Sequence, residues 1–325
     1  MRKIATATAP ANIAFVKYMG RKDDVLRLPD NGSISMNLSG IFSTTTVEFL
    51  PSLSQDDILI DGEGRVNEIA RVVAHLDRVR ELASFSDRAK VVSANNFSIG
   101  TGLSSSSSGF AALTVAACAA AGLKSSQKQL SILARQGSGS ACRSIPDGFV
   151  EWLDGSSNDT SYASSIFPPD YWDIVDVVAM VSTERKEIGS SQAHERVRSG
   201  PYYVSRIARM PAKIRQCKEI LAAKDFTAFG QFLEEEALDL HALFMSAGIV
   251  YLTPESLRLI RLVPIIRKRG IEAYFTLNTG QDVHMFCRSR DAVELKPVLE
   301  SLGWVRKVVV NTPAKGASLI AEHLF

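Results

Sequence analysis

Hydrophobic and polar positions follow two different periods along the first half of the chain. Segments that alternate every second residue predict strands at 5–18, 33–38, 44–49, 58–60 and 90–95. The segment 66–82 repeats its apolar residues every three or four positions, which predicts an amphipathic helix. A run of small apolar residues follows at 111–121 and predicts a long Ala-rich helix that Gly122 can end. A short helix at 127–135 and a strand at 149–152 complete this half.

The second half changes character after residue 181. A continuous apolar run at 174–181 predicts a buried strand, and the polar stretch 182–201 predicts a join between two domains. The later pattern predicts helices at 203–222, 227–246, 254–269 and 291–302, and strands at 273–277, 283–287 and 305–310. Segments 137–144 and 155–170 are expected to be loops. Helices mixed with hairpins indicate an α+β fold of two domains, residues 1–184 and 185–325, with the active cleft between them.

Composition narrows the class of protein. The 325 residues are 46% hydrophobic and 22% charged, which is typical of a globular chain and not of a disordered one. A net charge of +2 gives no field strong enough to predict a nucleic-acid partner. The four cysteines are widely spaced, which indicates reduced thiols in the cytoplasm, and no apolar run is long enough to span a bilayer. We therefore expect a soluble cytoplasmic protein without membrane or nucleic-acid partners.

Glycines and serines lead directly into the Ala-rich helix. Gly100 and Gly102 precede five consecutive serines at 104–108. A helix that begins there directs free N–H groups and its positive dipole end at one point, which favours a phosphate, and serine hydroxyls can bind Mg²⁺. The alternative is a flexible Ser-rich linker, but no polar segment separates the serines from the apolar run. The absence of a following Gly-Lys-Ser or Gly-Lys-Thr excludes a Walker loop.

A second Gly/Ser loop at 137–144 contains Arg143, whose planar guanidinium suits a carboxylate or phosphate. The alternative is a tight turn with a solvated arginine. Lys17 and Arg21 follow the first strand, where they either reach the same cleft or belong to a solvated loop. The five histidines have no metal-ligand spacing, and His241 is expected in the core. From these residues alone we expect a phosphoryl-transfer enzyme that acts on a small anionic molecule.

Four motifs carry a family resemblance. Residues 9–14 with 17–21, residues 95–106, residues 137–144 and residues 148–152 resemble motifs of the diphosphomevalonate decarboxylase family within the GHMP kinase superfamily. The likeness extends over about residues 5 to 290. It implies an N-terminal domain like domain 2 of ribosomal protein S5 and a ferredoxin-like C-terminal domain. Similar enzymes are often homodimers, and the sequence does not decide the oligomeric state.

The resemblance also implies an activity and a set of site residues. ATP phosphorylates the 3-hydroxyl of (R)-5-diphosphomevalonate, the new phosphate leaves, and loss of CO₂ gives isopentenyl diphosphate. The implied residues for ATP and Mg²⁺ are Asn96, Gly100, Thr101, Gly102, Leu103, Ser104, Ser105, Ser106 and Ser107, with Ser105 or Ser106 as the metal ligand. The implied residues for the isoprenoid diphosphate are Tyr18, Met19, Gly20, Arg21, Arg71, Ser138, Gly139, Ser140, Ala141, Cys142 and Arg143. Lys17 and Arg143 are the implied catalytic residues, and Arg143 would bind the carboxylate.

One position departs from the family pattern. The family has Asp-Ala-Gly-Pro-Asn where this chain has Asn278-Thr279-Gly280-Gln281-Asp282. The family's Asp orients or deprotonates the 3-hydroxyl, and Asn278 can accept a hydrogen bond but cannot take a proton. Asp282, four residues further on, could partly compensate only if the turn points it inward. Two alternatives therefore stay open: a relative that phosphorylates or decarboxylates mevalonate or its monophosphate, and a nucleotide-binding pseudoenzyme.

Overall fold

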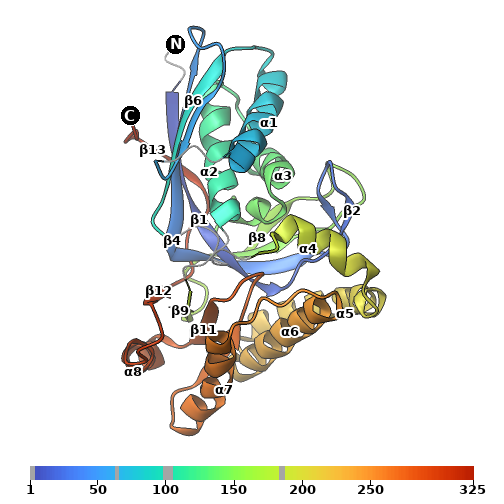
Figure 1. Ribbon diagram of the computed structural model, residues 1–325, viewed down its shortest axis with the longest axis vertical. Coiled ribbons are helices and arrows are strands. Elements are labelled where there is room, and N and C mark those ends of the chain that lie inside the picture. Colours follow the sequence, from blue (N-terminus) through green and yellow to red (C-terminus); the bar gives the residue numbers. More distant parts are fainter. Residues whose placement is uncertain (1–3, 63–65, 98–104, 183–186) are drawn as a thin grey trace.

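Two β-sheets with helices packed on them organise the chain (Figure 1). This computed structural model describes residues 4–62, 66–97, 105–182 and 187–325. The larger sheet has the order β13-β1-β4-β6-β5, with β7 paired to β4 and β8 paired to β7. Its strands are β1 (Ile4–Val16), β4 (Ser33–Leu50), β5 (Asp57–Ile60), β6 (Arg88–Asn95), β7 (Phe149–Trp152), β8 (Ala163–Phe167) and β13 (Ser318–Ile320).

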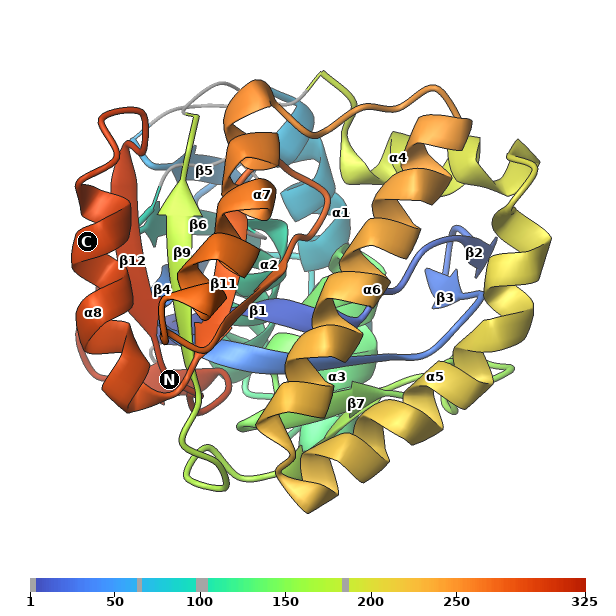
Figure 2. The ribbon, with the colours of Figure 1, turned by 90° about the horizontal axis from the view of Figure 1, so that it is seen from below.

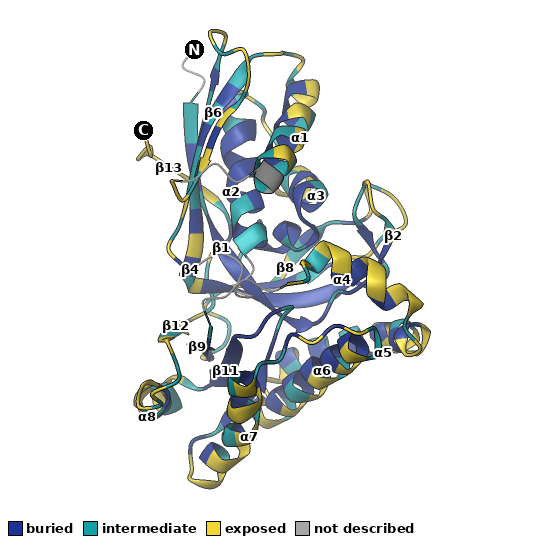
Figure 3. Cartoon of the chain, viewed as in Figure 1, coloured by how far each residue is buried: buried dark blue, intermediate teal, exposed yellow. Residues whose placement is uncertain are grey.

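Helices α1 (Val66–Ala83), α2 (Ser105–Ala120) and α3 (Gln127–Gly137) lie together beside the larger sheet (Figure 1). The Ala-rich helix α2 packs on β1 and β4 and is buried along nearly its whole length (Figure 3). A helix that is apolar on every side is stable only when other elements surround it, and small side chains let the sheet come close. The position of α2 also fixes its first turn, with Ser105 and Ser106, at one end of the sheet.

The smaller sheet is antiparallel, with the order β10-β11-β9-β12. Its strands are β9 (Val175–Met180), β10 (Ala273–Thr276), β11 (Val283–Cys287) and β12 (Lys307–Asn311). Helices α7 (Pro254–Lys268) and α8 (Ser289–Glu300) pack on it, and α6 (Phe226–Ser246) packs on its strand β10. Helix α5 (Tyr203–Ala223) lies beside α6, on the side away from this sheet (Figure 2). Local capping supports these boundaries, since Asp225 and Thr253 each accept a backbone N–H at the start of α6 and α7.

We call the larger sheet with its helices the first unit, and the smaller sheet with α5, α6, α7 and α8 the second unit. An aromatic cluster joins these two units. The ring of Phe15 on β1 lies 4.9 Å from that of Phe229 on α6 and 5.5 Å from that of Phe286 on β11, both edge to face. All three rings are buried. Such contacts add about 0.5–1.5 kcal/mol per pair beyond the burial of apolar area. The end of β1 is therefore held between the two units, and the residues that follow it are positioned by both.

The predicted α+β fold is confirmed, with local corrections. The strands predicted at 33–38 and 44–49 form one strand, β4, and β13 lies beyond the last predicted strand. The expected loop 137–144 contains a 3₁₀ helix, η1 (Gly139–Ser144), and the expected loop 155–170 contains β8. The polar stretch 182–201 contains α4 (Ser190–Arg196) and the 3₁₀ turn η2 (Val197–Ser199), and a hairpin of β2 (Arg21–Asp23) and β3 (Leu28–Pro29) follows β1. Segments this short are stabilised by tertiary contacts, so their own residue pattern does not predict them.

The boundary predicted at residue 184 does not coincide with the division between the sheets. Strand β9 precedes residue 184 and yet lies in the smaller sheet, where it pairs with β11 and β12. Strand β13, from the end of the chain, pairs with β1 in the larger sheet. A buried apolar strand carries no local sign of its partner. None of the helices in the described residues combines the length and apolarity that a membrane crossing requires.

Candidate active site

A cavity of about 440 Å³ lies where the end of β1 meets the two units. The first unit contributes Ala14, Lys17, Tyr18, Arg21, Arg27, Glu68, Arg71, Ser105, Ser106, Ser138, Gly139, Ser140 and Arg143 to its wall. The segment around α4 contributes Gly189, Ser190, Ser191, Gln192 and His194, and the remaining lining residues are Leu240, Asn278 and Thr279. A concave site between two units, with several convergent polar groups, is a typical place for a small-molecule site.

The cavity is strongly cationic. Its wall contains five basic side chains, those of Lys17, Arg21, Arg27, Arg71 and Arg143. Among the described residues, the one carboxylate that lines it is that of Glu68. Burial, with the nearby positive charges of Arg21 and Arg71, lowers the pKa of Arg27 to about 10. Clustered cations repel one another, and an anion among them removes that repulsion. The site is therefore built for a ligand with several negative charges.

Tyr18 and Arg21 are held in place by their neighbours. The Nε of Arg21 donates a hydrogen bond to the Tyr18 hydroxyl at 2.8 Å. The Tyr18 ring lies 4.6 Å from Trp152 and 4.2 Å from His194. Burial raises the pKa of Tyr18, which keeps its O–H available as a donor. An oxygen-rich anion can thus contact a fixed phenol and a fixed guanidinium together.

Arg143, on η1, is almost completely buried at the cavity wall. Its Nε and Nη2 donate to Asn12 Oδ1 at 3.3 and 3.0 Å, and its Nη1 donates to Ser33 Oγ at 2.8 Å. A guanidinium has five N–H donors, so these bonds use three and leave one on each terminal nitrogen. Two parallel donors on one fork match the two oxygens of a carboxylate.

Lys17 lies at the floor of the cavity beside Asn278. The Lys17 Nζ is 2.5 Å from the Ala14 carbonyl oxygen and 3.4 Å from Asn278 Oδ1. Asn278 Nδ2 in turn is 3.5 Å from the Asn12 carbonyl oxygen, so the same segment of β1 contacts Arg143, Asn278 and Lys17. Burial is the main reason that the pKa of Lys17 falls to about 7.

A second cavity of about 80 Å³, mostly apolar, adjoins the first. Its wall comprises Thr45, Ile58, Ile60, Val72, Val91, Ser93, Asn95, Gly109, Phe110 and Leu113, together with Glu68, Arg71, Ser105 and Ser106. Those last four residues also line the cationic cavity. The Arg71 guanidinium stacks 4.7 Å above the Phe110 ring and donates to the Gly137 carbonyl oxygen. An apolar cavity joined to a cationic one suits a ligand with a flat base and a polyphosphate chain.

Eleven of the residues predicted for the site line the cationic cavity. They are Lys17, Tyr18, Arg21, Arg71, Ser105, Ser106, Ser138, Gly139, Ser140, Arg143 and Asn278. The absence of a side chain at Gly139 is required, because a Cβ there would lie 2.8 Å from the Tyr18 hydroxyl oxygen. The predictions for Gly100, Thr101, Gly102, Leu103 and Ser104 lie outside the described residues.

Other predicted residues are not part of the cavity wall. Met19 packs in an apolar cluster with Val197 and Tyr203, and Gly20 turns beside Tyr203 with φ +89°. Ala141 and Cys142 are buried residues of η1 itself. Asn96 joins the end of β6 to β4 by bonds to Gly40 and Phe42, and Ser107 is fully buried. Asp282 accepts a hydrogen bond from the Val181 N–H at 3.1 Å and does not line the cavity, so the turn does not point it inward.

Sequence reasoning missed several wall residues. Arg27 comes from the β2–β3 hairpin, Glu68 from α1, and His194 from α4. His194 Nδ1 accepts the Gly20 N–H at 2.9 Å while its ring contacts Tyr18. Nothing near these residues in the sequence distinguishes them from surface residues, and no local signal could have found them.

The fold and the paired cavities define an enzyme of the GHMP kinase superfamily. Residues 9–163 match the family model of the diphosphomevalonate decarboxylase-like N-terminal domain. Residues 176–313 match the family model of the mevalonate 5-diphosphate decarboxylase C-terminal domain. The chain belongs to the diphosphomevalonate decarboxylase family.

Individual relatives support that assignment. The diphosphomevalonate decarboxylase of Candida albicans is 31% identical over 98% of this chain and 95% of its own length. The phosphomevalonate decarboxylase of Haloferax volcanii is 35% identical over 86% of this chain and 87% of its own length. The solved mevalonate diphosphate decarboxylase of Enterococcus faecalis, described for its ATP binding, has a TM-score of 0.91 and 31% identity over 98% and 99%. A solved complex with MVAPP, AMPPCP and magnesium has a TM-score of 0.91, with 32% identity over 98% and 99%.

Proposed function

We propose that this protein decarboxylates (R)-5-diphosphomevalonate to isopentenyl diphosphate, using ATP to phosphorylate the 3-hydroxyl. The observation that carries the proposal is the pairing of two donor sets in one cavity. Arg143 offers a two-pronged fork, and Tyr18, Arg21 and Arg27 form a separate cationic group. A substrate with a carboxylate at one end and a phosphate at the other satisfies both sets.

The nucleotide occupies the second cavity in this proposal. The base enters the apolar cavity, and the phosphates extend over Arg71, Ser105 and Ser106, which both cavities share. The hydroxyls of Ser105 and Ser106, with the Glu68 carboxylate, are oxygen ligands of the type that Mg²⁺ prefers. Magnesium, when bound, neutralises charge on the phosphates. A solved relative that is described in complex with AMPPCP and magnesium supports the binding of a nucleotide with magnesium.

The chain's own groups then act by position and charge. Arg143 holds the carboxylate, and Tyr18 with Arg21 holds the 5-phosphate group, so the 3-hydroxyl lies near Lys17 and Asn278. Fixed donors in a buried site contribute to catalysis because they need no reorganisation during the reaction. Departure of the 3-phosphate leaves a positive charge at C3, and the neutral amide of Asn278 does not neutralise that charge as a carboxylate would.

A second candidate substrate is (R)-5-phosphomevalonate. The Haloferax volcanii relative, at 35% identity, is named for that substrate. Both compounds carry the carboxylate and the 3-hydroxyl, and they differ in the number of phosphates that the cationic group must bind. The comparison of kcat/KM for the two compounds therefore tests the phosphate end of the cavity.

The test uses purified protein with ATP, Mg²⁺ and mevalonate, its 5-phosphate or its 5-diphosphate in turn, while ADP and CO₂ are measured together. Equal amounts of ADP and CO₂ with the diphosphate as the preferred substrate support the main proposal. The same result with the monophosphate supports the second candidate. ADP without CO₂ indicates a 3-kinase, and ATP binding without turnover indicates a pseudoenzyme. Either of these last results refutes both decarboxylase proposals.

The described cysteines, Cys118, Cys142, Cys217 and Cys287, are all unpaired and buried. Unpaired thiols are typical of a reducing compartment. We propose a cytoplasmic location, which these unpaired thiols support.

A further inference from the structure

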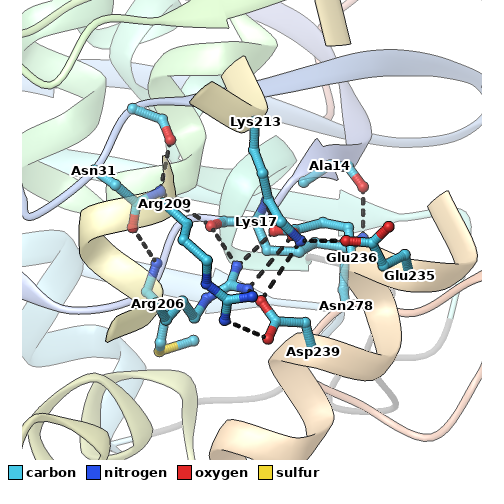
Figure 4. A network of polar contacts seen from close by, with 12 residues as sticks. Ala14, Lys17, Asn31, Arg206, Arg209, Lys213, Glu235, Glu236, Asp239 and Asn278 are labelled. Carbon is cyan, nitrogen blue, oxygen red and sulfur yellow. Dashed lines mark hydrogen bonds and ion pairs between the residues drawn. The ribbon is translucent and has the colours of Figure 1, made fainter. Parts of the chain in front are cut away.

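A buried network of charged side chains forms hydrogen bonds with the backbone of Lys17 (Figure 4). The Lys17 N–H donates to Glu236 Oε1 at 2.9 Å, and the Lys17 carbonyl oxygen accepts from Arg206 Nη2 at 3.3 Å and from Asn31 Nδ2 at 3.1 Å. Glu236 on α6 is fully buried and also accepts from Arg206 Nη2 at 2.5 Å and from Lys213 Nζ at 2.7 Å. Both backbone groups of Lys17 are thus held by charged side chains of the second unit.

The side chain of Lys17 is placed differently from its backbone. Its Nζ contacts two acceptors, the Ala14 carbonyl oxygen at 2.5 Å and Asn278 Oδ1 at 3.4 Å, and forms no ion pair with a carboxylate within the described residues. A neutral amine has two N–H groups and one lone pair. Two acceptors satisfy both N–H groups, which leaves the lone pair for a third direction. Lys17 also lines the cationic cavity.

The charges around Lys17 come from four elements and oppose one another. Burial has the largest effect and lowers the pKa of the amine, Glu236 on α6 raises it, and Arg143 on η1 and Arg206 on α5 lower it. Asp176 on β9 raises it further, and the resulting pKa is about 7. An amine with that pKa is available as a free base near neutral pH, and an ordinary lysine is not.

Within residues 4–62, 66–97, 105–182 and 187–325, the carboxylates that come into question as the base are placed elsewhere. Position 278 holds an amide, and Asp282 faces the Val181 N–H. Glu68 lines the junction with the apolar cavity, which the proposed function assigns to the nucleotide phosphates. Glu236 is enclosed by Arg206, Lys213 and the Lys17 backbone and does not line the cavity.

We propose that Lys17 is the catalytic base of this enzyme, that its Nζ accepts the proton of the substrate's tertiary hydroxyl, and that Glu236 is the positioning residue that holds it. The proposal rests on the proposed function, since it assigns a role within that reaction. It replaces the carboxylate of the family pattern by an amine on a different element.

The proton and electron pairs balance in this scheme. The 3-hydroxyl proton goes to the Lys17 lone pair, the hydroxyl oxygen forms a bond to the γ-phosphorus of ATP, and the bond to the bridging oxygen breaks to release ADP. The C3–O bond then breaks and the phosphate takes its electron pair. The bond between the carboxylate carbon and C2 breaks, its pair forms the new double bond, and CO₂ leaves. Lys17 returns its proton to solvent when the products depart.

Asn278 and a neutral Lys17 depend on each other. A carboxylate at position 278 would lie about as near to Nζ as the present Asn278 Oδ1, at 3.4 Å. Such a neighbour favours the charged ammonium, which has no lone pair and cannot accept a proton. The amide at 278 accepts a hydrogen bond without adding charge. The departure from the family pattern is thereby compatible with proton transfer.

The first experiment measures kcat/KM against pH for the wild type, Lys17→Arg and Lys17→Ala, each with the better of the two proposed substrates. We expect the wild-type rate to rise through an acid limb near pH 7. Lys17→Arg keeps the charge but cannot release a proton, so a loss of roughly 10³-fold is expected. Small alkylamines should rescue Lys17→Ala in proportion to the concentration of free amine. Retention of activity by Lys17→Arg within about tenfold, or rescue that follows the ammonium form, would overturn the proposal.

The second experiment separates Lys17 from titration of the substrate phosphate. Glu236→Gln removes a charge that raises the Lys17 pKa, so the acid limb should move to lower pH. Glu235→Gln is the matched control, because Glu235 is 70% exposed, contacts Lys213 and should leave the limb in place. Asn278→Asp should also move the limb to lower pH, since the new carboxylate becomes the base. It provides the same test if Glu236→Gln fails to fold.

The outcomes distinguish this inference from the proposed function. Wild-type turnover with an acid limb that neither Glu236→Gln nor Asn278→Asp moves would overturn the role of Lys17 and leave the proposed function intact. Absence of turnover with every substrate would refute the proposed function and this inference with it.

Discussion

Removal of the Arg143 guanidinium tests the carboxylate end of the cavity. Three of its five N–H groups bond to Asn12 and Ser33, and the remaining two form the fork assigned to the substrate. A hydrogen bond to a charged group contributes about 1.5–3 kcal/mol, so two contribute about 3–6 kcal/mol. This corresponds to a loss of roughly 10²–10⁴-fold in kcat/KM for Arg143→Met. Arg143→Lys keeps the positive charge but loses the two parallel donors. Its kcat/KM should lie between the values for the wild type and for Arg143→Met.

The assay follows ¹⁴CO₂ from carboxyl-labelled substrate, with the KM for ATP measured in parallel. ATP binding should change little, because Arg143 does not line the apolar cavity. Arg135→Met is the matched control, since Arg135 is equally buried and bonds to Leu26 and Asn158 but does not line either cavity. It should lower Tm and leave kcat/KM of the folded protein near the wild-type value. A kcat/KM for Arg143→Met within threefold of wild type would refute the assignment.

Three further variants test other parts of the molecule. Gly139→Ala places a Cβ 2.8 Å from the Tyr18 hydroxyl oxygen. It should raise the KM for the substrate at least tenfold and leave the KM for ATP unchanged. A substrate KM equal to that of the wild type in steady-state kinetics would contradict this. Arg71→Met removes a cation shared by both cavities and should raise the KM for ATP by about tenfold, for which nucleotide titration by calorimetry gives the check. Burial lowers the pKa of His75 to about 3 from 6.5, so its neutral form stabilises the fold fully above pH 6.5 and progressively less as the pH falls towards 3. From pH 7 to 5 this should remove about 2 kcal/mol of unfolding free energy, and urea unfolding of His75→Gln should show a smaller loss; an identical loss would exclude His75 as the cause.

The local patterns of the sequence were sufficient for most of the fold. The Ala-rich helix is buried on all sides, as its composition predicts, and the strand at β9 is buried along its whole length. The sheet to which β9 belongs could not be predicted, because pairing with β11 and β12 depends on residues about a hundred positions away. The burial of a strand can be predicted from its own residues, whereas the strands with which it pairs cannot.

The same distinction applies to the site. Ser138, Gly139 and Ser140 reach the cavity from one short segment, and their composition alone predicted an anion loop. Arg27 reaches it only because a hairpin folds back, and His194 only because α4 lies beside Tyr18. The ion network around Lys17 was equally hidden, since Glu236 follows Lys17 by more than two hundred residues in the sequence.

The last segment of the chain has a consequence for synthesis on the ribosome. Strand β13 pairs with β1, the Ala317 N–H donates to the Ser144 carbonyl oxygen at the end of η1, and a Cβ at Gly316 would meet the Ile145 carbonyl oxygen at 2.2 Å. The loop that carries Arg143 therefore packs against residues made some 170 positions later. While the chain is still being translated, the first unit has an open sheet edge and an unsupported substrate loop. Binding competence should appear only after residue 320 has emerged from the ribosome.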